Sequence, residues 1–313
     1  MIPPLVLSTK EIGPKGQRTS GGVIGIAASA SPFDKQLFLR GVQVLKRLGF
    51  KVYFRKDIFS KEGYLAGSDK RRAAELTELI RRKDVKAILF ARGGYGSQRL
   101  IPHLDLVRLK KYKKPLVGFS DLTALLNFLN QKGGFPTLYG PVLTQLGRKP
   151  LKRTIASLKW HLTQKKPHPP VSLKGCKILK QGKAVGKLAG GCLSLIVSSL
   201  GTPYALDTKN KILFFEDNTN EKVYTLDRML TQLKNAGCLK SVKAILIGTL
   251  HSKEANVQAT VAMLKDVLKD FKGPIVFGFP AGHTDDFVSL PMGIEVTLDT
   301  RRKKLEFKKP WVQ

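Results

Sequence analysis

Three polar residues with complementary chemistry each follow a short apolar run of the chain. Ser120 stands in GFSD, Glu216 closes KILFFEDN, and His283 follows PIVFGFPAG. A serine, a carboxylate and a histidine can act as nucleophile, orienting acid and general base, and the chain order Ser, acid, His is one known solution for a catalytic triad. Taken singly, none of these residues decides the chemistry. Taken together, they suggest a serine hydrolase.

Ser120 has an ordinary structural alternative. It lies between an apolar strand and an apolar helix, where a strand-to-helix turn would project its hydroxyl into a crevice at a helix N-terminus. A serine at this place can also simply cap the helix, and N-cap serines are common. Because Leu122 occupies the last position of the G-x-S-x-G pattern, the segment departs from the nucleophile elbow of α/β-hydrolases.

The acid and the base have alternatives of the same kind. Glu216 and its neighbour Asp217 can cap a following helix or orient a histidine. A lone loop histidine such as His283 is usually solvated surface. Asp285 and Asp286 make His283 a conceivable metal ligand, although the pattern H-x-D-D alone is poor evidence for a metal site.

A glycine-rich loop follows a third apolar run, in the sequence VKAILFARGGYGS. Residues 92–96, RGGYG, could cradle a phosphate, donate amides to an oxyanion, or form a tight turn that needs positive φ. The loop matches neither G-x-x-x-x-G-K-[ST] nor G-x-G-x-x-G, which weakens a nucleotide-binding interpretation. The oxyanion and turn interpretations both remain open.

The elements that would position these residues alternate between strand and helix. Strands are expected in GGVIGIAAS, KVYFRK, VKAILF and PLVGF, with helices over 34–48, over 68–82 with Ser68 or Asp69 as cap, and after GFSD. This alternation predicts an α/β fold with a mainly parallel, doubly wound sheet. Ligands bind at the carboxyl ends of the strands in such sheets, and both GFSD and RGGYG fall at such ends.

The second half of the chain restarts after a change of composition. Residues 151–185 contain nine Lys or Arg and no acid, together with KKPHPP, which is typical of a linker or domain edge. Short alternating strands near the end, GIEVTLD and KLEFKK, predict a mixed, β-rich second domain. We therefore expect an N-terminal extension over 1–20, an α/β domain over 21–150, a basic linker over 151–185 and a second domain over 186–313.

The chain is strongly basic. Its 313 residues contain 55 Lys and Arg against 23 Asp and Glu, a formal net charge of +32. The excess is +18 over residues 1–150, +9 over 151–185 and +5 over 186–313. Such a balance allows a non-catalytic protein that binds nucleic acid or another anionic polymer, but the sequence has no zinc finger, RNP-like motif or helix-turn-helix signature. Solvated lysines on helix faces are the ordinary explanation.

Cysteine and histidine usage points away from metals and disulfides. The three cysteines have no C-x-x-C spacing and the five histidines no H-E-x-x-H spacing, so we expect reduced thiols, no metal and no cofactor. No run approaches 18 apolar residues, and the N-terminus lacks the basic start and apolar core of a secretory signal. We therefore expect no membrane span and a cytoplasmic location.

Several separated segments, in order, resemble the LD-carboxypeptidases, also called muramoyltetrapeptide carboxypeptidases. The segments are IGIAASASP, ILFARGGYGSQRLIPHLD, LVGFSDLTALLN, AGGCLSLIVSSLGTPY, LFFEDNTNEKVYTLDRMLTQLKNAG and FPAGHTDDFVSLPMG. The resemblance implies a flavodoxin-like doubly wound N-terminal domain, a smaller β-rich C-terminal domain, an active site in the cleft between them, and a homodimer.

The resemblance also implies roles for individual residues. Ser120 would be the nucleophile, Glu216 the acid and His283 the base of a Ser-Glu-His triad. Backbone amides of Asp121 and of the RGGYG loop, namely Gly94, would form the oxyanion hole. Arg92 is a candidate partner for the substrate's terminal carboxylate, or forms a structural ion pair instead. The implied reaction removes the terminal D-alanine from murein tetrapeptides or muropeptides in peptidoglycan recycling, through an acyl-enzyme.

A second reaction is open within the same family resemblance. Relatives that resemble microcin C resistance proteins use the same triad to cut an aminoacyl-nucleotide compound. They would need an aromatic platform for the base, and the only tryptophans, Trp160 and Trp311, do not adjoin a triad motif. The non-catalytic, nucleic-acid-binding alternative rests on charge alone.

Overall fold

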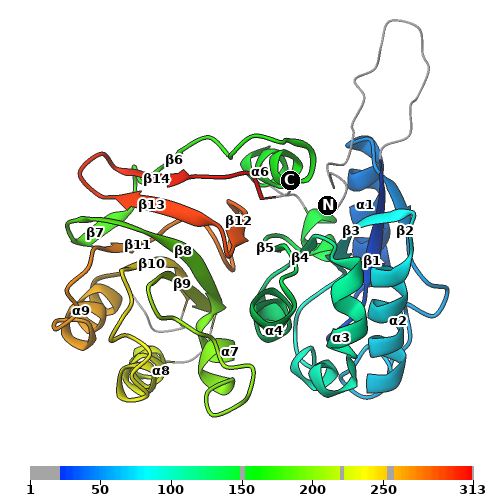
Figure 1. The fold of residues 1–313 in the computed structure, drawn as a ribbon, viewed down its shortest axis with the longest axis horizontal. Helices are drawn as coiled ribbons and strands as arrows, with labels where there is room; N and C mark the ends of the chain where they lie inside the picture. The colour runs from blue at the N-terminus through cyan, green and yellow to red at the C-terminus, as the bar shows by residue number, and fades with distance from the viewer. Residues whose placement is uncertain (1–21, 149–151, 219–221, 252–256, 312–313) are drawn as a thin grey trace, which may run out of the picture. The chain divides into compact units, whose positions relative to one another are not determined.

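A computed structural model describes residues 22–148, 152–218, 222–251 and 257–311 (Figure 1). The expected extension over 1–20 lies outside these residues. The chain divides into two compact units. The first runs through Lys166 and also takes in Asp285–Pro291 and the residues from 310 onward, and the second comprises Pro167–Thr284 and Met292–Lys309.

The first unit contains a six-stranded sheet in the order β12-β5-β4-β3-β1-β2 (Figure 1). Neighbouring strands from β2 to β5 are parallel. The order 2-1-3-4-5 is that of flavodoxin-like sheets, with β12 added beside β5 from a distant part of the chain. The strands are β1 (Val23–Ala27), β2 (Lys51–Tyr53), β3 (Val85–Phe90), β4 (Leu116–Gly118), β5 (Thr137–Tyr139) and β12 (Leu290–Met292).

Helices cover both faces of this sheet. The connection from β1 to β2 runs toward one edge of the sheet, whereas the connections from β2 to β3, β3 to β4 and β4 to β5 run toward the opposite edge. Because crossovers are right-handed, α1 lies on one face and α2, α3 and α4 lie on the other. Consistent with this, α1 packs on α5, whereas α3 contacts both α2 and α4. Their bounds are α1 (Lys35–Arg47), α2 (Asp69–Arg81), η1 (Gln98–His103), α3 (Leu106–Leu109), η2 (Lys110–Tyr112), η3 (Ser120–Leu122), α4 (Thr123–Gly133), α5 (Leu143–Leu146) and α6 (Lys152–Thr163).

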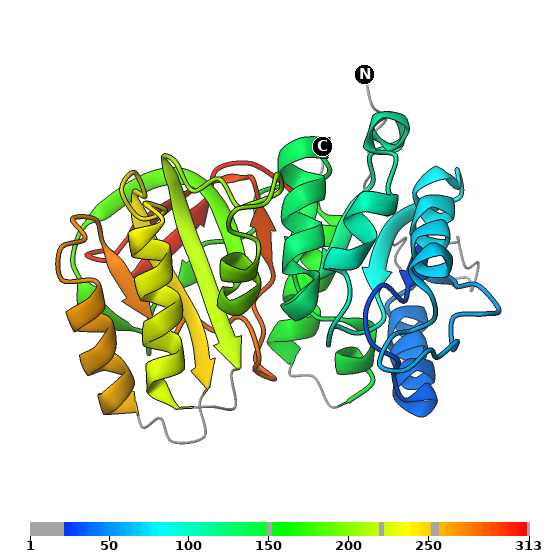
Figure 2. The ribbon, with the colours of Figure 1, turned by 90° about the horizontal axis from the view of Figure 1, so that it is seen from below.

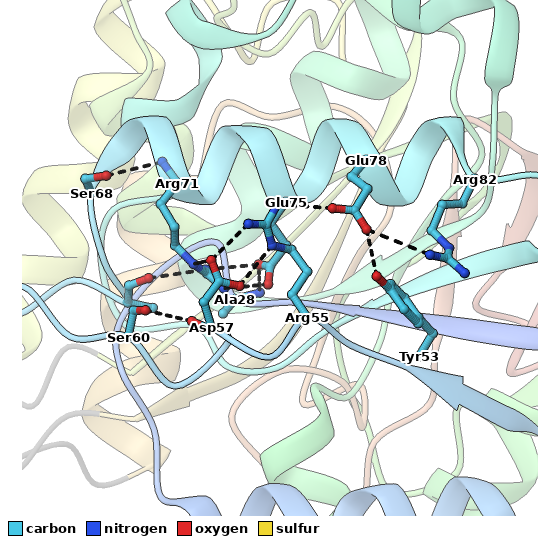
Figure 3. Close-up of polar contacts among 11 residues, drawn as sticks. Ala28, Tyr53, Arg55, Asp57, Ser60, Ser68, Arg71, Glu75, Glu78 and Arg82 are labelled. Atoms are coloured by element: carbon cyan, nitrogen blue, oxygen red, sulfur yellow. Dashed lines mark hydrogen bonds and ion pairs between the residues drawn. The ribbon is translucent and has the colours of Figure 1, made fainter.

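Helix α2 is fixed to the end of β1 by a network of ion pairs (Figure 3). Ser68 caps the helix, its hydroxyl accepting from the Arg71 amide. Arg71 bridges Asp57 and the fully buried Glu75, whose carboxylate also accepts from the Ala28 amide at 2.7 Å. Because Ala28 directly follows β1, this network fixes the carboxyl end of that strand.

The second unit contains an eight-stranded mixed sheet in the order β6-β14-β13-β8-β9-β10-β11-β7. The four central strands, β8 to β11, are parallel, while β13, β14 and β6 on one side and β7 on the other are antiparallel. The strands are β6 (Val171–Ser172), β7 (Lys177–Lys180), β8 (Lys183–Cys192), β9 (Lys211–Asn218), β10 (Ala244–His251), β11 (Ile275–Phe277), β13 (Glu295–Asp299) and β14 (Lys304–Phe307). The α/β class and the mixed second sheet are confirmed.

Three helices cover one face of the parallel strands: α7 (Leu193–Ser198), α8 (Val223–Asn235) and α9 (Val257–Val267). Figure 2 shows α8 in yellow and α9 in orange beside the strands. Their leucines, including Leu226, Leu230 and Leu264, pack with Phe215 and Ile245 of the sheet in one apolar core. Burial of this face holds β9 and β10 in place beneath the loops that carry the second half of the candidate site.

The basic stretch over 151–185 contains regular elements. Lys152–Thr163 form α6 of the first unit, so this part of the stretch is a helix and not a linker, whereas the domain edge that the composition also indicated falls within the stretch. After the unit boundary at Lys166, residues 171–185 supply β6, β7 and the start of β8. Lysines here lie on the surface of ordinary elements. In the described part of the chain, no helix is long and apolar enough to cross a membrane.

Candidate active site

Ser120 sits on a strained turn at the end of β4. It follows Phe119 and has φ of +64°, one of three positive φ values among the described non-glycine residues. Positive φ costs a residue with a Cβ roughly 1 kcal/mol or more, and such strain is found at functional turns. The next residues continue as η3 and α4, so the side chain stands where β4 meets the N-terminus of a helix.

The N-cap alternative for Ser120 does not fit the structure. The N-cap residue of α4 is Leu122, and α4 has no side-chain capping hydrogen bond. Instead, the Thr123 hydroxyl donates to the Ser120 carbonyl at 2.7 Å. The Ser120 amide donates to the hydroxyl oxygen of buried Tyr139 at 3.1 Å. Tyr139 ends β5, the neighbouring strand, so the adjacent strand end holds the strained turn.

The RGGYG loop packs directly against this turn. A Cβ at Gly93 would lie 3.2 Å from the Ser120 Cβ, and one at Gly94 would lie 2.4 Å from the Ser31 hydroxyl oxygen. Gly94 has φ of +104°, which a residue with a side chain rarely adopts. The Tyr95 amide donates to the same Ser31 hydroxyl at 3.0 Å. Glycines are therefore required both by backbone conformation and by close approach to the serine turn.

The Asp121 side chain joins the two loops. Its carboxylate is buried and accepts from the amides of Gly96 at 3.2 Å and Ser97 at 2.8 Å. The Ser97 hydroxyl in turn donates to the Asp121 carbonyl at 2.6 Å. Burial raises the pKa of Asp121, against the lowering effect of these hydrogen bonds. Asp121 thus fixes the RGGYG loop against the turn that carries Ser120.

Arg92 is exposed at the start of the RGGYG loop. Its Nη1 donates to the Pro32 carbonyl at 2.7 Å, which lies in the loop after β1. A carbonyl partner leaves the charge of the guanidinium available to an anion. The structural ion pair that was the alternative for Arg92 is not found among the described residues.

Glu216 and His283 form a hydrogen-bonded pair in the second unit. The Glu216 carboxylate is fully buried near the end of β9, and its Oε2 lies 2.8 Å from His283 Nδ1. The same oxygen accepts from the His283 amide at 3.0 Å. A buried carboxylate on Nδ1 fixes the ring orientation and favours the tautomer with the proton on Nδ1.

The loop after β11 reaches Glu216 by crossing the end of β10. Phe279 donates its amide to the Ile247 carbonyl at 3.0 Å, and the Thr249 amide donates to the Ala281 carbonyl at 3.2 Å. A Cβ at Gly248 would lie 2.3 Å from the Ala281 oxygen, and one at Gly282 would lie 2.3 Å from Glu216 Oε2. These two glycines let the histidine loop approach the carboxylate.

Opposing effects set the pKa of His283. Burial lowers it, but the hydrogen bond and the negative charge of Glu216, with a further contribution from Asp217, outweigh burial and raise the pKa above its usual value. Glu216 therefore stabilises the imidazolium, the form that a general base reaches when it takes a proton.

Asp217 has a different partner set from its neighbour. Its Oδ2 accepts from the Ser194 amide at 2.7 Å at the start of α7, and the Cys192 thiol lies 3.5 Å away. Burial raises the pKa of Cys192 well above its usual value, and the charges of Asp217 and Glu216 add to this, so the thiol stays protonated and unreactive. Asp217 thus binds the N-terminus of α7, a helix that precedes it in the chain, and the following helix α8 has Lys222 as its N-cap residue with no side-chain capping hydrogen bond. Glu216, by contrast, orients the histidine.

The predicted site residues fall into two groups, one in each unit. Ser120, Asp121, Gly94 and Arg92 lie around the ends of β3 and β4 in the first unit, and Glu216 and His283 form their pair in the second. Asp286 forms an ion pair with Arg153. Within the described residues, no group of three His, Cys, Asp or Glu side chains could hold a metal ion.

Sequence reasoning missed Tyr139, Ser31 and the carboxylate role of Asp121. Tyr139 and Ser31 each end an apolar strand run, as TLYG and IAASAS, and this placement was the available signal. It was weak because a hydroxyl at a strand end has many ordinary uses. Gly248, inside the strand AILIGTL, gave the clearer signal of close backbone approach.

Comparison with known proteins gives a consistent family. The chain matches the LD-carboxypeptidase N-terminal domain over residues 24–140 and the LD-carboxypeptidase C-terminal domain over residues 185–298. A probable murein peptide carboxypeptidase of Bacillus subtilis is 36% identical over 289 residues, covering 90% of each chain. The microcin C7 self-immunity protein of Escherichia coli is 27% identical, covering 91% of this chain and 92% of that protein.

Solved structures give the same result for the fold. A muramoyltetrapeptide carboxypeptidase from Oxalobacter formigenes matches with a TM-score of 0.81 at 30% identity, covering 91% of this chain and 97% of its own. The wild-type microcin C7 self-immunity protein matches with a TM-score of 0.86 at 27% identity, covering 94% and 98%.

Proposed function

Because the chain belongs to the LD-carboxypeptidase family, we propose that it is a serine carboxypeptidase that removes the terminal D-alanine from murein tetrapeptides. The observation that carries this proposal is the hydrogen bond of 2.8 Å between the buried Glu216 carboxylate and His283 Nδ1. It prepares a histidine base of the kind a serine nucleophile needs. Ser120 on its strained turn is the nucleophile that we assign to this base.

The proposed reaction begins with proton transfer to His283. With Nδ1 donating to Glu216, the lone pair of Nε2 accepts the Ser120 proton as Oγ attacks the carbonyl before the terminal D-alanine. The imidazolium then protonates the departing amino group, which leaves the tripeptide esterified to Ser120. Water, deprotonated by the same histidine, hydrolyses the ester and restores the enzyme. No cofactor takes part in these steps.

The oxyanion requires backbone donors other than the amide of Ser120. That amide is already engaged by the Tyr139 hydroxyl. The amides of Asp121 and Gly94 are the donors we assign, because Asp121 follows Ser120 in the sequence and Gly94 follows Gly93, which packs against the Ser120 side chain. Among the described residues, the exposed Gly94 amide has no acceptor. Each such donor contributes about 10²–10³ in rate.

Arg92 is the group we assign to the substrate's terminal carboxylate. Its side chain is exposed at the edge of the RGGYG loop and is held at one nitrogen by the Pro32 carbonyl. A guanidinium can accept a carboxylate in bidentate fashion and thereby select a free C-terminus. The proposed homodimer and the place in peptidoglycan recycling rest on the family alone.

A second substrate class is supported by the relatives. The microcin C7 self-immunity structures match the chain with TM-scores up to 0.86. One of them is a complex with aspartyl sulfamoyl adenosine, so an aminoacyl-nucleotide hydrolase is the alternative within the same catalytic scheme. Trp160 is on α6, and Trp311 is 5% exposed, so Trp311 offers little surface for stacking on a base.

One assay distinguishes these functions. We expect the purified protein to release D-alanine from a murein tetrapeptide much faster than it hydrolyses an aminoacyl-sulfamoyl adenosine, with EDTA having no effect. Ser120→Ala should abolish both activities without loss of folded structure by circular dichroism. Faster hydrolysis of the nucleotide would transfer the assignment to the alternative, and no hydrolysis of either compound would refute the proposed enzyme.

A further inference from the structure

Arg72 occupies a position in α2 that the helical pattern reserves for an apolar residue. It lies four and seven residues before Leu76 and Leu79, on the buried stripe of the helix. Its side chain is 0% exposed, and it is the largest fully buried side chain among the described residues. Burying a guanidinium costs several kcal/mol unless every donor is satisfied. The hydrogen-bond partners of the Arg72 guanidinium therefore indicate the role of this buried charge.

The guanidinium of Arg72 gathers backbone carbonyls from three segments. Nη1 donates to the Ser29 carbonyl at 2.7 Å and to the Gly96 carbonyl at 2.8 Å, and Nε donates to the Gly67 carbonyl at 3.2 Å. Nη2 pairs with the Asp69 carboxylate. Ser29 follows β1 and Gly96 ends the RGGYG loop, so one side chain ties that loop to the end of β1.

Gly96 is held from both sides. Its carbonyl accepts from Arg72, while its amide donates to the carboxylate of Asp121, the residue after the nucleophile. Its φ is +116°, and a Cβ there would lie 2.9 Å from Arg72 Nη1. With the Ser97 amide also on Asp121, the end of the loop has no freedom to shift relative to the serine turn.

We propose that Arg72 is a positioning residue for hydrolysis, which holds the RGGYG loop so that the Gly94 amide is presented to the oxyanion. The inference rests on the proposed function, because it assigns the loop the role of oxyanion donor. A well-packed apolar side chain often stabilises a protein as much as a buried ion pair does. The arginine thus supplies a fixed loop conformation that a methionine would not.

Arginine is required here because of its geometry. The planar fork directs three separate nitrogens at four acceptors, whereas a lysine keeps the charge but offers one ammonium group on a flexible stem. In Arg72→Lys one ammonium group with three N–H donors would face four acceptors, the carbonyls of Ser29, Gly67 and Gly96 and the Asp69 carboxylate, so it cannot satisfy all of them. A displacement of about 1 Å in a catalytic group can cost on the order of 10²-fold in rate.

The test compares Arg72→Lys with Arg71→Lys in tetrapeptide hydrolysis. Arg71 is the preceding residue of the same helix and pairs with Glu75 and Asp57. Among the described residues, it has no hydrogen bond or ion pair to the RGGYG loop. We expect Arg72→Lys to lower kcat by roughly 10- to 100-fold with KM changed less than about twofold. The affinity for a peptide aldehyde, an inhibitor that forms an oxyanion on the serine, should fall by a similar factor. Arg71→Lys should lower the melting temperature while kcat stays within about twofold.

Amide hydrogen exchange provides a second readout that does not depend on activity. The hydrogen-bonded amides of Tyr95, Gly96 and Ser97 should exchange faster in Arg72→Lys than in the unmodified protein, and remain protected in Arg71→Lys. If Arg72→Lys does not fold, Asp69→Asn loosens the same guanidinium from its partly exposed side and should lower kcat by about 3- to 10-fold.

Two results would overturn the positioning role: a kcat for the Arg72 variant within twofold of normal, or unchanged exchange in the loop. A protein that releases no D-alanine at all would refute the proposed function instead, while the exchange data would still decide whether Arg72 holds the loop.

Discussion

At the scale of single residues, the two halves of the proposed triad are prepared in different ways. Ser120 is held in a strained conformation by a hydrogen bond from its amide to the Tyr139 hydroxyl. His283 is held by one Glu216 carboxylate oxygen, which accepts hydrogen bonds from both the ring Nδ1 and the backbone amide of the histidine. The strain exposes a nucleophile, and the paired carboxylate fixes a tautomer. Both preparations exist before any substrate is bound.

The pH dependence of hydrolysis should report the His283–Glu216 pair. His283 must be neutral to accept a proton, and its pKa is raised, so the acid limb of kcat/KM should have its midpoint above 6.5. In Glu216→Gln the burial that lowers the pKa is no longer opposed by a charge. We therefore expect the limb to move to lower pH while kcat falls by on the order of 10³- to 10⁴-fold. A limb that stays in place would exclude His283 as the titrating base.

The raised pKa also has a consequence for stability. A histidine whose folded pKa exceeds its unfolded value contributes stability below about pH 6.5, and this contribution is lost as the pH rises through the folded pKa. His283 therefore stabilises the second unit most in the protonated form, although it is active in the neutral form.

At the scale of elements, glycine and ionic contacts decide where the loops can go. Gly248 and Gly282 give the histidine loop room to reach β9, and the network around Arg71 fixes α2 against the end of β1. The strand ends could be predicted from apolar runs because each run stops at a turn residue. The contacts between loops could not, since they depend on single donors such as Tyr139.

The boundaries of the elements were likewise predictable only where local sequence decides them. Local sequence predicted Ser68 or Asp69 as the cap of α2, and the cap is Ser68. The strand ends at GFSD and RGGYG also followed from local sequence. The basic stretch over 151–185 was harder, because helix α6 has its apolar residues spaced among lysines and no acidic cap signal at its start. Arg72 was overlooked for a related reason: a charged residue in a helix is assumed to face water.

The ionic network on α2 should make stability depend on acid. Hydrogen bonding from Arg55, together with Arg71, lowers the pKa of Asp57 to about 2. A carboxylate with a lowered folded pKa contributes stability above its unfolded pKa of about 3.9, and loses it as the pH falls toward 2. Asp57→Asn should lower the free energy of unfolding by about 1 kcal/mol at pH 6, a figure reduced for solvent screening. Urea unfolding would contradict this if the cost were the same at pH 6 and pH 2.5.

At the scale of the whole molecule, the formal charge of +32 remains its most unusual property. The described basic residues are distributed over helices and strands of both units, with few in the proposed site. The fold and family could be predicted from ordered motifs, whereas charge alone suggested a polymer-binding protein. Electrostatic fields act on encounter rates and solubility more than on fold or chemistry.

Salt should therefore act on substrate capture. We expect kcat/KM for an anionic tetrapeptide to fall as ionic strength rises from about 0.01 to 0.15 M, where the Debye length shortens from roughly 30 to 8 Å, while kcat stays constant. A tetrapeptide of zero net charge that keeps its terminal D-alanine carboxylate serves as the control for general salt effects on the enzyme. A kcat/KM independent of salt would remove any steering role for the net charge.

The most direct test of the proposed triad is a double-variant comparison of tetrapeptide hydrolysis. Ser120→Ala and His283→Ala remove one group from each unit. If the two act in one reaction step, each single variant should lower kcat by roughly 10³-fold or more, and the double variant should be no slower than the slower single variant. A single variant with near-normal activity, or losses that multiply in the double variant, would contradict a shared catalytic mechanism for Ser120 and His283.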